Sequence, residues 1–219
     1  MRALVTGGTG KLGSAIVARL VQEGWRVIAA GTKDGDLADA DAARALVERA
    51  VDELGGLDVL VNGAAAGFEP KPVEEVTEED WDAALDVTAK GSFFVTQAAA
   101  PHLRSNGGVV VMLEDVAAYQ PWPSFAPHSA AKAAQAMLTR VFAKALAPEV
   151  RVCGVAPGSV AVDRGQEERR AAETVLGKVG SPDDVADAVL YLAGADFVTG
   201  TSLVVDGGRL VQSGRLRGT

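Results

Sequence analysis

Arg2–Gly13, which reads RALVTGGTGKLG, passes from a short apolar run into a cluster of glycines. From Leu12 to Val21 apolar side chains recur near helical spacing, so the expected order is strand, glycine turn, helix. Such a turn presents backbone N–H groups and a helix N-terminus to a pyrophosphate, and its glycines let the backbone approach the phosphates closely. A glycine-rich turn also occurs without a ligand, so this motif alone leaves both interpretations open.

The composition is that of a globular chain with a sizeable core, since 48% of its 219 residues are hydrophobic and 23% are charged. A formal net charge of −8 argues against non-specific binding to nucleic acid or to an anionic membrane. Cys153 is the only cysteine, which excludes an intrachain disulfide and fits a reducing compartment. With no leader-like segment and no apolar stretch of membrane-spanning length, we expect a cytoplasmic protein.

Strands and helices alternate along the rest of the chain. Apolar runs predict strands at 26–30, 57–62, 109–113, 151–156 and 202–205, and helices are expected at about 41–53, 78–103, 129–145 and 182–192. Strands that are apolar at every position indicate a parallel sheet covered on both faces. The sequence therefore predicts one α/β domain over residues 1–219, with a doubly wound parallel sheet. The polar, poorly periodic segment 159–176 is expected to be a mobile loop or lid over the substrate.

Several landmarks, in the right order over roughly residues 2–210, resemble the short-chain dehydrogenase/reductase family. They are Thr6, Gly7 and Gly13 in the glycine turn, Asn-Gly-Ala-Ala at 62–65, Pro157-Gly158, and the closing Val-Thr-Gly…Val-Asp-Gly-Gly at 198–208. The resemblance implies a Rossmann-like domain that binds a nicotinamide cofactor and transfers a hydride. It implies cofactor contacts from the following residues: Thr6, Gly7, Thr9, Lys11, Leu12, Gly13, Thr32, Lys33, Asp36, Leu37, Asn62, Ala64, Lys132, Pro157 and Gly158.

The end of the second strand predicts NADP(H) in preference to NAD(H). NAD-specific enzymes of this fold place a carboxylate there to bind the ribose 2′-hydroxyl. The corresponding residue here is Gly31, and Thr32, Lys33 and Lys11 are available to a 2′-phosphate. Asp34 is the counter-evidence, because the short loop could bring its carboxylate to the ribose.

Three residues stand at the positions of the family's catalytic serine, tyrosine and lysine: Asp115, His128 and Lys132. Aspartate in place of the serine, and the Lys11-Leu12-Gly13 turn, resemble the pteridine reductase branch, whereas histidine in place of the tyrosine does not. Spacing of four puts His128 and Lys132 on one helix face, although His128 could instead be a surface or capping residue.

Two further positions bear on the substrate and on proton delivery. Phe68 lies near the position where pteridine reductases stack a planar ring, and a rim or core phenylalanine is the alternative. Thr88 replaces an asparagine that supports the family's proton relay.

Two classes of function follow from these residues. The first is an NADP(H)-dependent reductase of a pterin-like C=N or a carbonyl group in a small molecule. The alternative is a cofactor-binding family member with little catalysis, acting as a sensor or interaction subunit. The family resemblance also implies a homotetramer or homodimer, paired through the helices expected at 78–103 and 129–145.

Overall fold

The computed structural model describes residues 1–67, 69–160 and 164–212. Its six strands form one sheet in the order β2-β1-β3-β4-β5-β6, and every neighbouring pair is parallel. The strands are β1 (Arg2–Thr6), β2 (Arg26–Ala30), β3 (Val59–Asn62), β4 (Val109–Leu113), β5 (Arg151–Pro157) and β6 (Ser202–Val205). This arrangement confirms the predicted doubly wound, Rossmann-like α/β domain.

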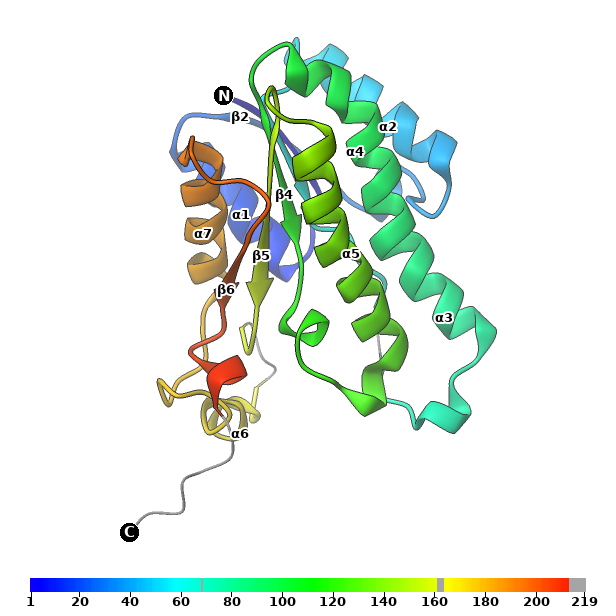
Figure 1. Ribbon diagram of the computed structural model, residues 1–219, viewed down its shortest axis with the longest axis vertical. Helices are drawn as coiled ribbons and strands as arrows, with labels where there is room; N and C mark the ends of the chain where they lie inside the picture. The colour runs from blue at the N-terminus through cyan, green and yellow to red at the C-terminus, as the bar shows by residue number, and fades with distance from the viewer. Residues whose placement is uncertain (68, 161–163, 213–219) are drawn as a thin grey trace.

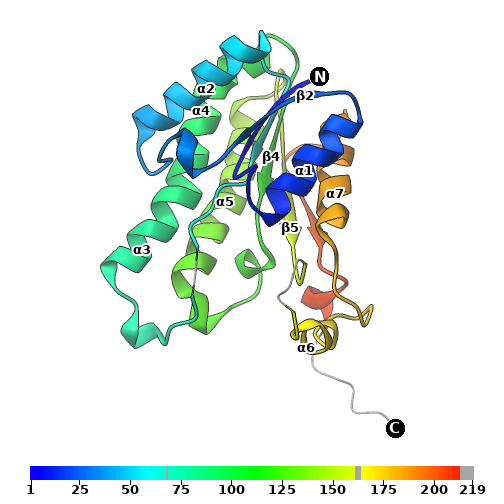
Figure 2. The same ribbon diagram turned by 180° about the vertical axis from the view of Figure 1, so that it is seen from behind.

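Helices cover both faces of the sheet (Figures 1 and 2). They are α1 (Lys11–Gln22), α2 (Ala40–Leu54), α3 (Glu78–Leu85), α4 (Gly91–Arg104), α5 (Ala126–Ala145), α6 (Glu167–Ala171) and α7 (Pro182–Gly194). Helices α2, α4 and α5 pack on one face, and α1 and α7 pack side by side on the other. None of the helices in the described residues is long and apolar enough to cross a membrane.

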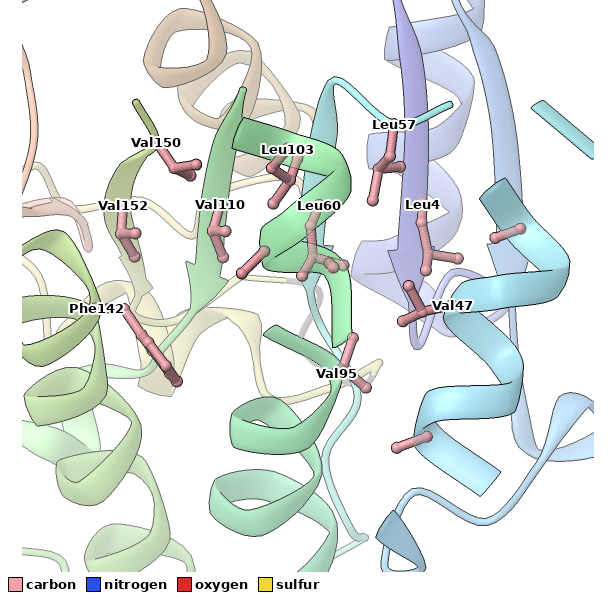
Figure 3. Close-up of a cluster of buried hydrophobic side chains, with 14 of the residues drawn as sticks. Leu4, Val47, Leu57, Leu60, Val95, Leu103, Val110, Phe142, Val150 and Val152 are labelled. Atoms are coloured by element: carbon pink, nitrogen blue, oxygen red, sulfur yellow. The ribbon is translucent and has the colours of Figure 1, made fainter. Parts of the chain in front are cut away.

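Alternate residues of each strand belong to two separate cores. Leu4, Leu60 and Val110 pack against α2, α4 and α5, as Figure 3 shows. Val5 and Val61, their sequence neighbours, pack against α1 and α7. Successive side chains of a strand point to opposite faces, so a sheet covered on both sides needs apolar residues at every position. This explains why these strands read as continuous apolar runs.

The order of the strands creates a crevice at their carboxyl ends. From β1 the chain moves to β2 on one side of the sheet, and β3 then pairs with β1 on the other side. Ligands of open α/β sheets bind at such a switch point, because the loops leaving the two central strands diverge there. The glycine turn after β1 and the residues after β3 and β4 are therefore brought to one edge.

The elements differ from the expected ones at several points. The helix expected at 78–103 is divided by a π-helical turn, Asp86–Lys90, where the N–H of Gly91 donates to the carbonyl oxygen of Asp86. Helix α5 begins at Ala126 rather than at 129, because a proline in its first turn, Pro127, needs no N–H partner. The segment 159–176 is not all loop, since α6 lies within its described residues.

Candidate active site

The turn after β1 requires glycine at two of its positions. Gly7 has a φ of 66°, and a Cβ there would lie 2.5 Å from the carbonyl oxygen of Gly63. A Cβ on Gly13 would lie only 2.1 Å from the carbonyl oxygen of Gly7. The N–H of Gly10 donates to that same oxygen at 3.0 Å, which closes the turn at the start of α1. Close packing, as well as backbone freedom, therefore explains these glycines.

Replacement of Gly13 is expected to destabilise the protein. Gly13→Ala would force a methyl group against backbone atoms, which should cost about 2–3 kcal/mol in the free energy of unfolding. Gly10→Ala is the matched control, because a Cβ there meets nothing closer than 3.4 Å, and it should cost less than about 1 kcal/mol. Urea unfolding of both variants without cofactor measures the difference, and equal losses would contradict this account of the turn.

A cleft runs across the glycine turn in two connected parts, of about 460 Å³ and 390 Å³, which share Gly7, Gly10, Gly63 and Ala65. Thr6, Gly7, Thr9, Thr32, Asp36, Leu37 and Ala64 line the larger part, and Gly7, Lys11, Leu12, Gly13, Lys132, Pro157 and Gly158 line the smaller. A glycine-floored cleft in two halves fits an extended dinucleotide, with its pyrophosphate at the N-terminus of α1.

Two described residues with predicted ligand contacts do not line this cleft. Lys33 and Asn62 are not among its described lining residues. Asn62 is fully buried, and its amide nitrogen donates to the hydroxyl of Thr96 at 2.8 Å. The substrate residue expected at Phe68 lies outside the described residues.

The residue at the end of β2 has no carboxylate of its own, but the carboxylate of Asp34 lies against it. A Cβ on Gly31 would lie 2.4 Å from Oγ1 of Thr9, so a larger side chain would have to displace that threonine. The carboxylate of Asp34 turns back and accepts a hydrogen bond from the N–H of Gly31 at 2.8 Å. In place of a full helix, the chain makes a single 3-10 turn from Thr32 to Asp34 before α2.

Asp115, His128 and Lys132 all line the smaller part of the cleft. Asp115 follows β4, and its Oδ1 accepts a hydrogen bond from the N–H of Ala117 at 2.7 Å. Its Oδ2 lies 3.6 Å from Nε2 of His128, whose side chain is only 5% exposed. Because α5 starts at Ala126, His128 lies within its first turn and is not a surface cap.

Lys132 is buried beneath this pair. Its ammonium group donates to the carbonyl oxygen of Leu113 at 2.6 Å and to Oε1 of Gln135 at 3.0 Å. Burial lowers the pKa of Lys132 to about 8, and the charges of Asp115 and Glu114 oppose that effect only in part. The amine is therefore poised to change charge close to neutral pH.

A buried chain of hydrogen bonds that starts at Lys132 was not predicted from the sequence. Nε2 of Gln135 donates to the hydroxyl of Ser92 at 2.8 Å, and that hydroxyl donates to the carbonyl oxygen of Thr88 at 2.6 Å. Gln135 continues the face of α5 that carries His128 and Lys132, at spacings of seven and three. A polar stripe at this spacing in an alanine-rich helix was the available signal.

Glu114 is a second buried group that the sequence did not identify. Its carboxylate accepts hydrogen bonds from the hydroxyls of Tyr119 (2.6 Å), Thr139 (2.6 Å) and Ser202 (3.0 Å). Burial, together with the bond to Glu114, raises the pKa of Tyr119 to about 12. These bonds tie the end of β4 to α5 and β6, and so fix the backbone that carries Asp115.

Known proteins similar in sequence to this chain are reductases and dehydrogenases. The family described as enoyl-(acyl carrier protein) reductase matches residues 11–209. Dehydrogenase/reductase SDR family member 4 of Homo sapiens is 33% identical over 94% of this chain and 86% of its own.

Two solved structures carry nicotinamide cofactors. The 3-ketoacyl-(acyl-carrier-protein) reductase of Brucella melitensis, complexed with NADH, is 26% identical over 95% of this chain and 97% of its own, with a TM-score of 0.89. A short chain dehydrogenase of Burkholderia cenocepacia in complex with NADP is 31% identical with the same coverages and a TM-score of 0.85. The chain therefore belongs to the short-chain dehydrogenase/reductase family of oxidoreductases, which bind nicotinamide cofactors.

Proposed function

We propose that this chain reduces the carbonyl group of a small molecule with NADPH, and that His128 is the proton donor. The observation that carries the proposal is the placement of Asp115, His128 and Lys132 together, in a cleft that continues across the glycine turn. A bound nicotinamide cofactor would supply the hydride. The protein's task is then to hold the carbonyl group and to deliver one proton to its oxygen.

The proton step uses groups within the site. Protonated His128 gives its N–H proton to the carbonyl oxygen, so the N–H bond breaks as the O–H bond of the alcohol forms. Oδ2 of Asp115 lies 3.6 Å from Nε2 of His128, so a carboxylate stands beside the ring that gives up the proton. Lys132, whose pKa burial lowers to about 8, lines the same part of the cleft.

A turnover assay with NADPH and a panel of aldehydes, ketones, quinones and pterins tests this function. Reduction of at least one carbonyl compound, with cofactor oxidation matched by alcohol formation, is the expected result. Tight cofactor binding without turnover across the whole panel would favour the sensor or interaction subunit instead. That alternative is not favoured at present, because the relatives above are named as reductases or dehydrogenases.

A pterin-like C=N group is the second candidate acceptor. Asp115 favours it, since an acid at this position resembles pteridine reductases and lies beside His128. A carbonyl group is the leading candidate because one of the similar proteins above, from Brucella melitensis, is named as a ketoacyl reductase. Turnover of dihydropterins but of no carbonyl compound in the same panel would reverse this order.

NADP⁺ is expected to bind about tenfold or more tightly than NAD⁺. Gly31 at the end of β2 has no side chain to bind a ribose 2′-hydroxyl, the carboxylate of Asp34 is engaged by the N–H of Gly31, and Thr32 lines the cleft beside it. Calorimetric titration with both cofactors measures the ratio. Thr32→Glu, which adds a carboxylate at this edge, should reduce it, and equal or tighter NAD⁺ binding by the unaltered protein would refute the preference.

We also propose that the protein is a homotetramer, or at least a homodimer, and that it is cytoplasmic. Helix α5 exposes Met137 and Val141, at 54% and 48%, on the face that a two-fold contact between copies would cover. Light scattering at micromolar concentration is expected to give at least twice the chain's mass. A monomeric mass would rule out the assembly.

A further inference from the structure

Arg209 is a nearly buried cation in the wall of the candidate active site. It follows β6, where the carboxylate of Asp206 accepts hydrogen bonds from the N–H groups of Gly208 and Leu210, both at 2.7 Å, and so holds the turn. Its side chain is 12% exposed. It lines the same part of the cleft as His128.

Three contacts fix the guanidinium group of Arg209. Its carbon lies 4.9 Å from the centre of the Trp122 ring, its Nη1 donates to Oγ of Ser159 at 3.0 Å, and its Nη2 lies 3.0 Å from Oε2 of Glu173. Tryptophan is the aromatic platform that attracts a cation most strongly. The group is thus held in one orientation before any ligand arrives, which lowers the entropic cost of binding.

Among the residues that the structure describes, the charges around Arg209 do not balance. Arg170 of α6 lines the same part of the cleft, and its Nη1 lies 3.1 Å from the same oxygen of Glu173. Two guanidinium groups therefore share one carboxylate among the residues that the structure describes. A guanidinium has five N–H donors, and in this part of the chain Ser159 and Glu173 are the only acceptors for those of Arg209. Within residues 1–67, 69–160 and 164–212, donors and one positive charge therefore remain for a ligand.

Arg209 reaches the cleft from another part of the sheet than the glycine turn does. Trp122, Ser159 and Arg209 follow β4, β5 and β6, whereas the glycine turn follows β1. Residues of both groups line the same part of the cleft, together with His128 and Lys132. Binding of an anion and binding of the cofactor therefore have to be measured separately.

We propose that the substrate of this enzyme is a carbonyl compound that also carries a carboxylate, and that Arg209, assisted by Arg170, binds this carboxylate. A planar, fixed guanidinium matches a carboxylate with two parallel hydrogen bonds. Binding of the anion gives each of the two arginines a carboxylate partner. The inference deepens the proposed function and rests on it only for the reactive end of the substrate, because binding of the anion is measurable without turnover.

Two substitutions separate anion recognition from a merely structural ion pair. Arg209→Gln and Glu173→Gln both break the same contact, so a structural role would move binding in the same direction. Anion recognition predicts opposite directions, because Glu173 competes with the ligand for the two guanidinium groups. Arg19→Gln is the matched control, since Arg19 also pairs with two carboxylates, Glu23 and Asp187, but lies outside the described lining of this cleft.

The binding arm uses benzoate and its neutral counterpart benzamide, titrated calorimetrically into the protein saturated with NADP⁺. Benzoate is expected to bind at least tenfold more tightly than benzamide. Arg209→Gln should reduce this ratio at least tenfold, Glu173→Gln should raise it about threefold, and Arg19→Gln should leave it unchanged. Equal binding of the two probes, or shifts of the same sign in the two glutamine variants, would overturn the proposal. A weaker affinity of Arg209→Gln for NADP⁺ itself, with no change in this ratio, would instead assign Arg209 to the cofactor.

The turnover arm compares 4-carboxybenzaldehyde with its methyl ester. The ratio of their kcat/KM values should favour the acid and should follow the binding ratio through the same three variants. Reduction of the ester at least as efficient as that of the acid would contradict the carboxylate site while supporting the proposed function. Selective binding of benzoate with no reduction of either aldehyde would contradict the function while supporting the carboxylate site.

Discussion

His128→Ala is expected to lower kcat for carbonyl reduction by about 10²–10⁴-fold, the range that a positioned general acid contributes. The affinity for NADP⁺ should change little, because His128 lies within α5 and is not part of the glycine turn. In the unaltered enzyme, reduction should slow as pH rises, since a neutral imidazole no longer carries the proton to be donated. Steady-state rates from pH 5 to 10 measure both effects.

Two further variants make this prediction specific. His102→Ala is the matched control, because His102 is the only other histidine and its Nε2 lies 3.4 Å from the exposed Glu48. It should leave the rate unchanged. His128→Tyr should retain activity but move the pH profile, because a phenol and an imidazole hold protons over different ranges. Full activity of His128→Ala would transfer the role of acid to Asp115 acting through water.

Lys132→Met is expected to lower kcat/KM by at least about 10²-fold, the effect of removing a polar group that orients the reacting groups. The ammonium group donates hydrogen bonds to the carbonyl oxygen of Leu113 at the end of β4 and to the side chain of Gln135 on α5. Its loss would therefore also leave these two acceptors without their hydrogen bonds from Lys132. Gln135→Leu, which removes only the second contact, should have a smaller effect. A Lys132→Met enzyme of normal activity would exclude any part for this amine.

Lys132 should also give the folding stability a distinct pH dependence. Its pKa is about 8 in the folded protein and 10.5 in the unfolded chain, so the unfolded chain binds more protons between these values. The free energy of unfolding should therefore rise with pH across this window, by up to about 3 kcal/mol from this group alone. Urea unfolding at pH 7 and pH 10 should show this rise in the unaltered protein and not in Lys132→Met. Parallel curves for the two proteins would mean that the buried amine keeps its proton in the folded protein throughout this window, as it does in the unfolded chain.

Local patterns sufficed for most of the fold. Val109–Leu113 is a strand with the predicted bounds, because an apolar run that ends in a turn specifies a buried parallel strand without reference to distant residues. The glycine turn was likewise predictable, since a Cβ on Gly13 would clash with Gly7 in the same turn. Gly7 is also confined by Gly63, a distant residue that follows β3. Apart from that contact, these features depend on short-range chemistry.

The features that were missed depend on tertiary packing. The π-helical turn Asp86–Lys90 has no sequence signature of its own. It directly precedes Gly91, which packs against Leu37: a Cβ added to Gly91 would lie 3.0 Å from the carbonyl oxygen of Leu37 and 3.1 Å from its Cβ. Gln135 was not identified because its partner Ser92 is 43 residues away. The role now proposed for Arg209 depends on Trp122, Ser159 and Glu173, which come from three different connections.

The candidate site was therefore predictable in part. Asp115, His128 and Lys132 were selected by family spacing, and the structure brings all three into one cleft. Their catalytic roles remain predictions. Neither the partners of Lys132 nor the burial that lowers its pKa could be read from spacing alone.

Transfer of deuterium from NADPH labelled at C4 of the nicotinamide tests the central claim most directly. The labelled cofactor is mixed with the enzyme and 4-carboxybenzaldehyde, its methyl ester or another carbonyl compound reduced in the panel, and the product is analysed by mass spectrometry. The account predicts deuterium on the carbinol carbon, formed with the unaltered enzyme and at least about 10²-fold more slowly with His128→Ala. Saturation with NADPH but no label in any product, or labelling at the same rate with His128→Ala, would contradict it.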